Sequence, residues 1–151
     1  MEHLAPLSPS ARRDMLRRVR NVYLCGFMGC GKTTVGRLLA KHWGWPFVDT
    51  DAVIEKQEGF SISELFSRFG EPRFREIEAG VVANVTAHIG QIVALGGGAL
   101  LDEASRERVV DSGRLIGLSV PANVLYERLR NEWASRPLLS TVPSHLGQEH
   151  I

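Results

Sequence analysis

The chain has 151 residues, and its eighteen basic residues nearly balance seventeen acidic ones, giving a formal net charge of +1. This length fits one domain with a single core, and the balanced charge gives no indication of a nucleic acid or an anionic membrane as a partner. No apolar run approaches the ~20 residues of a membrane helix, and the two cysteines, Cys25 and Cys30, form no disulfide framework. We therefore expect a cytoplasmic protein.

The first twenty residues form a basic arm that differs from the rest of the chain. They include five arginines between residues 12 and 20. This composition predicts either a peripheral helix or a loose tail. Glu2 and Asp14 argue against an organelle-targeting leader, because such leaders are poor in acidic residues. We expect the domain itself to begin at residue 21.

From residue 21 onward, apolar runs alternate with helical patterns, which is typical of βα units and a parallel sheet. A first strand is predicted over residues 21–25, followed by a glycine-rich loop and a helix over residues 32–43. A second, short strand over Phe47 and Val48 ends at Asp49. The fold class is therefore α/β.

The second half continues the alternation. Ser61, with Glu64 three residues later, is a capping box that predicts the start of a short helix. The further elements are expected over residues 72–88 (helix), 92–95 (strand), a helix opening at Asp102, 115–120 (strand, ended by Pro121) and 122–130 (helix). Prolines and glycine without a clear period predict loop from residue 133, and residues 140–151 are expected to form an irregular tail.

The strongest motif is GFMGCGKT at residues 26–33, which matches G-x-x-x-x-G-K-[ST] between a predicted strand and a predicted helix. Its glycines let backbone N–H groups converge on phosphate oxygens, and the helix N-terminus adds positive charge. A chance glycine-rich turn would not match all four fixed positions in this context. The motif predicts ATP binding by Gly29, Cys30, Gly31, Lys32, Thr33 and Thr34.

Two acids follow the second strand. Asp49 and Asp51 lie where open α/β sheets bind ligands, at the carboxyl ends of the strands. Asp49 could hold Mg²⁺ through water, and Asp51 could orient or deprotonate a substrate hydroxyl. The competing interpretation is that one of them caps the helix that begins near residue 52.

Three further features are ambiguous when taken singly. Arg75 and Glu78 are three residues apart on a predicted helix and can form a pair, although an exposed salt bridge is the simpler interpretation. The glycines at residues 96–98 allow close approach of backbone to a ligand, or give only a flexible loop. Arg136, in a loop-rich segment, is either a surface residue or part of a lid that closes on the triphosphate.

The five histidines show no zinc-ligand spacing with cysteine.

Taken together, these residues resemble the shikimate kinase family over residues 21–139. The matching features, in that family's order, are residues 26–34, 49–51, 70–78 (GEPRFREIE), 95–98 (LGGG) and 136–139 (RPLL). The resemblance implies a three-layer, nucleoside-monophosphate-kinase-like fold around a five-stranded parallel sheet. It also implies transfer of the ATP γ-phosphoryl group to the 3-hydroxyl of shikimate, a step toward chorismate and the aromatic amino acids.

The resemblance also implies roles for individual residues. Asp51, Arg75 and the glycines Gly96, Gly97 and Gly98 would contact shikimate, with Asp51 as the acid–base residue, Arg75 on the carboxylate and Glu78 in support. Thr33 and Asp49 would hold Mg²⁺, the latter through water. Lys32 and Arg136 would neutralise charge at the transferring phosphoryl group. That family has a further arginine several residues before the lid arginine; Arg128 and Arg130 straddle this spacing and do not meet it, so Arg130 is expected to be only a weak nucleotide contact.

The match ends after the predicted lid. Residues 140–151 do not match that family's C-terminal helices and fifth strand, so we expect a sheet without its last strand. Its open edge would expose apolar surface or be covered by another chain; otherwise we expect a monomer. Two alternatives stay open: a truncated, catalytically impaired nucleotide-binding protein, or another small-molecule kinase such as a gluconate kinase or a nucleotide kinase.

Overall fold

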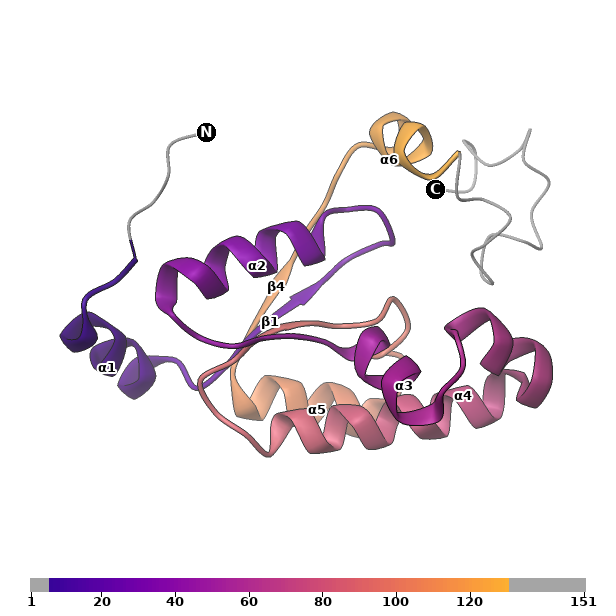
Figure 1. Cartoon of the computed structure of the whole chain (residues 1–151), viewed down its shortest axis with the longest axis horizontal. Coiled ribbons are helices and arrows are strands. Elements are labelled where there is room, and N and C mark those ends of the chain that lie inside the picture. Colours follow the sequence, from indigo (N-terminus) through magenta and orange to yellow (C-terminus); the bar gives the residue numbers. More distant parts are fainter. Residues whose placement is uncertain (1–5, 131–151) are drawn as a thin grey trace.

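The computed structural model describes residues 6–130, in which a four-stranded parallel sheet is flanked by helices (Figure 1). The helices are α1 (Pro9–Arg18), α2 (Lys32–Trp43), α3 (Thr50–Glu58), α4 (Ile62–Thr86), α5 (Glu103–Ser112) and α6 (Ala122–Leu129). The strands are β1 (Val22–Cys25), β2 (Phe47–Asp49), β3 (Ile92–Ala94) and β4 (Arg114–Gly117), in the spatial order β2-β3-β1-β4. The α/β class with a parallel sheet is confirmed.

The central strands β1 and β3 are apolar on both faces, as strands of a covered parallel sheet must be. Tyr23 and Val93 pack in one core cluster with side chains of α4, and Leu24 and Ile92 pack in another with Ala40 of α2. Figure 1 shows α2 on one side of the sheet and α4 and α5 on the other. The result is the predicted arrangement of three layers.

The register of the sheet brings several strand ends to one edge. Asp49 at the end of β2 pairs with Ala94 at the end of β3, and Cys25 at the end of β1 pairs with Gly117. The loops that follow these strands therefore begin side by side, which is the arrangement that places ligands in open α/β sheets.

The fourth strand is shorter than residues 115–120, so that prediction was too long. Leu118 N still donates to Cys25 O at 2.8 Å, but β1 ends there and the chain turns at Gly26 into the glycine-rich loop. Beyond Leu118, β1 therefore offers no strand partner for residues 119 and 120. The apolar side chains Leu115 and Ile116 are exposed on β4.

The two helices predicted on either side of Gly70 are joined end to end in α4. Gly70 has φ 79° and ψ 167°, a conformation outside the helix that glycine adopts readily, and Pro72 follows it. The predicted capping box at the start of α4 is present, because Glu64 N donates to Ser61 Oγ (3.2 Å) and Ser61 N donates to Glu64 Oε2 (2.9 Å).

Of the two possibilities for the N-terminal arm, the structure has the peripheral helix, α1. The arm is attached to the end of α2 farther from the glycine-rich loop, where Leu7 N donates to His42 O at 2.7 Å. No helix within residues 6–130 has the length and apolar character needed to cross a membrane. Arg136 and the tail at residues 140–151 lie outside the described residues, and the domain limits of 21 and 139 stay predictions.

Candidate active site

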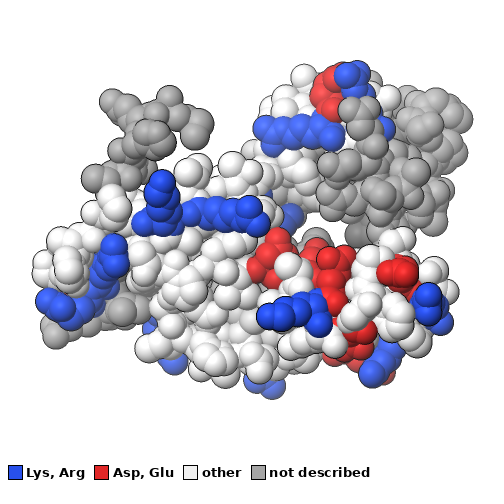
Figure 2. All heavy atoms as spheres, viewed as in Figure 1, with Lys and Arg blue, Asp and Glu red and all other residues white. Residues whose placement is uncertain are grey.

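A cavity of about 1160 Å³ opens at the carboxyl edge of the sheet. The residues that line it come from the glycine-rich loop, the start of α2, the end of β2, α3, both halves of α4, the glycine turn after β3 and the end of α6. In Figure 2 a hollow lies beside a cluster of acidic side chains. Asp49, Asp51, Glu55 and Glu78 all line the cavity, so it is strongly acidic on one wall.

The glycine-rich loop depends on backbone conformations that only glycine adopts easily. Gly26 has φ 144°, and a Cβ there would meet Leu118 O and lie 2.8 Å from Cys30 Sγ. Lys32, the first residue of α2, donates from Nζ to Gly26 O at 2.7 Å and to Phe27 O at 3.3 Å. The ammonium group is therefore held at the mouth of the loop, where it can reach an anion bound by the loop.

Asp49 links the loop to the acidic wall. Its Oδ1 accepts from Asp51 N (3.1 Å) and Ala52 N (3.4 Å), which caps α3, and its Oδ2 accepts from Thr33 Oγ1 at 3.2 Å. The capping interpretation thus applies to Asp49, and the side chain of Asp51 remains available to contact a ligand.

The pair of Thr33 and Asp49 fits Mg²⁺. This cation prefers oxygen ligands and is usually bound by one or two carboxylates together with water and substrate phosphates. Within residues 6–130, no group of three His, Cys, Asp or Glu side chains could hold a metal ion. The donor set here is therefore suited to a cation that arrives with phosphates.

Asp51 lies deeper in the cavity. Burial, with help from the negative charges of Asp49 and Glu78, raises its pKa to about 6, and Lys32 opposes the shift. A carboxyl group with a pKa near 6 is largely ionised at pH 7 yet remains basic enough to accept a proton from a substrate. Its position and its pKa suit a general base.

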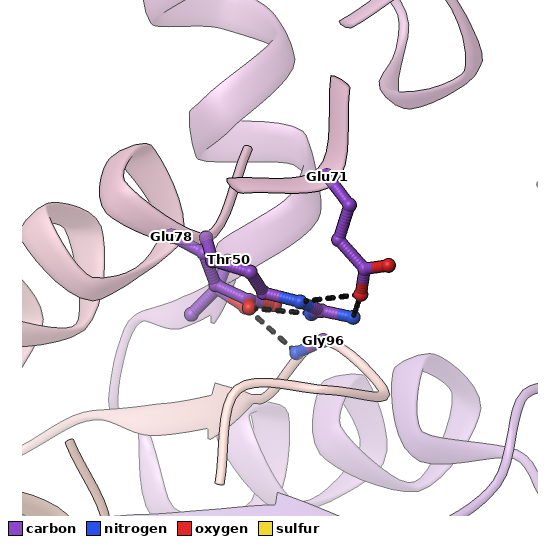
Figure 3. Close-up of polar contacts among 5 residues, drawn as sticks. Thr50, Glu71, Glu78 and Gly96 are labelled. Atoms are coloured by element: carbon purple, nitrogen blue, oxygen red, sulfur yellow. Dashed lines mark hydrogen bonds and ion pairs between the residues drawn. The ribbon is translucent and has the colours of Figure 1, made fainter. Parts of the chain in front are cut away.

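Arg75 is fixed between two glutamates. Its Nη1 donates to Glu78 Oε2 at 2.7 Å, while Nε (3.2 Å) and Nη2 (2.9 Å) both donate to Glu71 Oε1 (Figure 3). Glu78 is buried, with 4% of its side chain exposed, so the interpretation as an exposed salt bridge is wrong. Burial raises the pKa of Glu78, although Arg75 opposes the shift. For Arg75 itself burial acts to lower the pKa, but the bonds to Glu78 and Glu71 raise it.

The three glycines have different surroundings. A Cβ at Gly96 would lie 2.5 Å from Asp51 Oδ1 and 2.9 Å from Glu78 Oε1, and a Cβ at Gly98 would overlap the guanidinium of Arg75. Gly97 is exposed and lines the cavity, whereas Gly96 is buried and lies behind it. At Gly96 and Gly98, charged side chains therefore pack directly against the backbone, whereas a Cβ at Gly97 would meet nothing within 4 Å.

The sequence interpretation gave no role to two residues that contact this site, Glu71 and Arg128. Arg128 lines the cavity and donates to Gly29 O at 2.9 Å, whereas Arg130 pairs with Glu127 at 3.0 Å and does not line the cavity. Glu71 could have been found from its i,i+4 spacing to Arg75. No local sequence signal separates Arg128 from Arg130, because the partner of Arg128 is Gly29, which is 99 residues away. Arg136 lies outside the part of the chain that the structure describes.

A family model described as shikimate kinase matches residues 28–149, which extends beyond residue 139, where the resemblance was expected to end. The shikimate kinases of Thermodesulfovibrio yellowstonii and Geobacter sulfurreducens are 46% and 43% identical to it over 121 and 122 residues. These matches cover 80% and 81% of this chain, and 69% and 67% of those proteins.

Among solved structures, shikimate kinase from Acinetobacter baumannii in complex with shikimate aligns with a TM-score of 0.82 and 34% identity, over 91% of this chain and 76% of that one. Shikimate kinase from Aquifex aeolicus aligns with a TM-score of 0.71 and 31% identity, over 87% of this chain and 80% of that one.

Proposed function

The chain belongs to the shikimate kinase family, and from this we propose that it transfers the γ-phosphoryl group of ATP to the 3-hydroxyl of shikimate. The observation that carries the proposal is the joining of two half-sites in one cavity. Lys32 and Thr33 form a phosphate-binding half, and Asp51 and Arg75 form a half suited to a hydroxylated carboxylate. A hydroxyl next to Asp51 would face phosphates bound at the loop.

The phosphate half uses backbone and charge. The amides of residues 29–34 and the N-terminus of α2 attract phosphate oxygens, and Lys32 contributes a full positive charge near the β- and γ-phosphates. Thr33 and Asp49 would hold Mg²⁺, which supplies charge neutralisation at the phosphate oxygens when it is bound with ATP. We also propose a contact from Arg128, and we retain the predicted closing role of Arg136.

The acceptor half fixes the substrate at two points. Arg75 is a guanidinium suited to a carboxylate, and Glu78 holds it in place from a buried position. Asp51 accepts the proton of the attacking hydroxyl as that oxygen approaches the γ-phosphorus. Because little covalent chemistry falls to the protein in phosphoryl transfer, most of the rate enhancement is expected from positioning and electrostatics.

The first experiment is coupled ADP release with ATP and Mg²⁺, with and without shikimate, on the parent chain and on Asp51→Asn. We expect turnover that requires shikimate and is lost in the variant, while binding of ATP is kept. Gluconate and a nucleoside monophosphate serve as control acceptors. Turnover with either control and none with shikimate would reject the proposal, and ATP binding without any turnover would support a catalytically impaired nucleotide-binding protein.

A further inference from the structure

We infer that Glu71 competes with the substrate carboxylate for the guanidinium of Arg75 and thereby sets the affinity for the substrate. This inference rests on the proposed function, because it assumes that a carboxylate binds at Arg75. It assigns a role in substrate affinity to a half-exposed residue, with 55% of its side chain in solvent.

The donors of Arg75 are only partly free. A guanidinium has five N–H donors, and a carboxylate is bound best through two parallel N–H groups. Glu71 Oε1 takes the bonds from Nε and Nη2, and Glu78 takes one from Nη1. The edge formed by Nε and Nη2, one of the two that can hold a carboxylate in this way, is therefore available to a ligand only when Glu71 moves away.

The two glutamates differ in how readily they can move. Glu78 is almost completely buried, so breaking its bond to Arg75 would leave an uncompensated charge in the protein interior. Glu71 follows Gly70, where the chain leaves helical geometry, and water can solvate its carboxylate as soon as the bond to Arg75 breaks. Glu71 is thus the partner that a ligand can displace.

Arg75 does not need Glu71 to keep its position. A Cβ at Gly98 would overlap its guanidinium, so the glycine turn packs directly against that group. Its Cζ lies 5.3 Å from the centre of the Phe74 ring, and Glu78 still holds Nη1. These contacts argue against a purely supporting role for Glu71.

The charges around Arg75 also support competition between Glu71 and the substrate. One guanidinium faces two carboxylates, so the group as a whole is negative before a ligand carboxylate arrives. Removing the charge of Glu71 leaves Arg75 balanced by Glu78 alone, and removing the side-chain oxygen as well frees the edge formed by Nε and Nη2. An anionic substrate should then bind more tightly, while the geometry at Asp51 and the glycine-rich loop stays the same.

The test compares the parent with Glu71→Gln and Glu71→Ala, and uses Glu76→Gln as the matched control. Glu76 lies on the same helix and also pairs with an arginine, but its partner is Arg73 and not Arg75. Shikimate binding is measured by calorimetry, and kcat and KM by ADP release. We expect Kd and KM for shikimate to fall about two- to fivefold in both Glu71 variants, as for loss of an exposed ion pair, with kcat and the KM for ATP unchanged. Glu76→Gln should match the parent.

The competition should also weaken with salt, because an exposed ion pair is screened. The gain in affinity is therefore expected to shrink when NaCl is raised from low to high concentration. An unchanged or higher Kd in folded Glu71 variants, checked by thermal unfolding, would overturn the inference and make Glu71 inert or a support for Arg75. If the parent neither binds nor phosphorylates shikimate, the proposed function fails first, and the inference falls with it.

Discussion

Thr50 Oγ1 accepts a hydrogen bond from Gly96 N at 2.8 Å and donates one to Ala94 O at 3.3 Å. A single buried hydroxyl at the start of α3, directly after β2, is therefore joined to the glycine turn after β3 (Figure 3). Because Asp51 is the next residue, this hydroxyl also fixes the candidate base relative to the candidate substrate-binding turn. Loss of this hydroxyl should therefore change both stability and activity.

Replacing Thr50 by valine keeps the shape but removes the hydroxyl. Gly96 N would lose its partner in the interior, so we expect the free energy of unfolding to fall by about 1–3 kcal/mol, and kcat to fall because the turn shifts. Urea unfolding and ADP release measure these two effects. Thr50→Ser retains the hydroxyl and should keep kcat; equal activity of the valine variant would show that the link is not needed.

The rate should depend on the ionisation of Asp51. Burial and the neighbouring acids raise its pKa to about 6, and a general base works only when it is deprotonated. We therefore expect kcat/KM for shikimate to rise tenfold per pH unit at low pH and to level off above about pH 6. A profile that stays flat between pH 5 and 7 would contradict this role.

The ionisation of Asp51 should have the opposite effect on stability: the free energy of unfolding should fall as the pH rises. A carboxyl group with a raised pKa binds its proton more tightly in the folded state, so it lowers stability as the pH rises from its ordinary value of 3.8 to about 6. Asp51→Asn removes this penalty. We expect the variant to be more stable than the parent at pH 7.5 by on the order of 1–3 kcal/mol, with no difference below pH 4, as measured by urea unfolding.

An added methyl group at Gly98 should damage substrate binding selectively. Its Cβ would overlap the guanidinium of Arg75, so Gly98→Ala is expected to raise the KM for shikimate at least about tenfold without changing that for ATP. Gly80→Ala is the control: no atom lies within 4 Å of its Cβ position on α4. That variant should retain activity and gain roughly 0.5–1 kcal/mol in stability.

The two arginines near the end of α6 can be separated by mutation. Arg128 contacts Gly29 O in the glycine-rich loop, whereas Arg130 contacts Glu127 on its own helix. We expect Arg128→Ala to raise the KM for ATP about tenfold, as for loss of a charged hydrogen bond, and Arg130→Ala to change it less than twofold. A larger rise in the KM for ATP in the Arg130 variant would support the nucleotide contact that the sequence predicts for Arg130.

Features that rest on short sequence spacing could be predicted well. The glycine-rich loop with Lys32, the capping box at Ser61 and the start of α2 each depend on fixed local geometry, and the structure has all three. The pairing of Arg75 with Glu78 was also predicted from spacing alone. Their common property is that all the partners lie within one or two helical turns.

Features that depend on contacts between distant segments could not be predicted. The end of β4 is set by where β1 stops, and the choice of Arg128 over Arg130 is set by where α6 faces the loop. Gly96 and Gly98 differ from Gly97 because charged side chains from distant segments pack against the first two, while a Cβ at Gly97 would meet nothing within 4 Å. A run of three identical residues carries no information about that packing.

Lys32 already has two oxygen partners within its own loop, Gly26 O and Phe27 O. When phosphate oxygens bind this ammonium, they replace acceptors that it already has, so the net gain is smaller than the number of new contacts. The Lys32 ammonium therefore keeps oxygen acceptors when no phosphate is bound. We expect these carbonyl groups to compete with phosphate oxygens for the lysine, and so to weaken the binding of ADP as well as that of ATP.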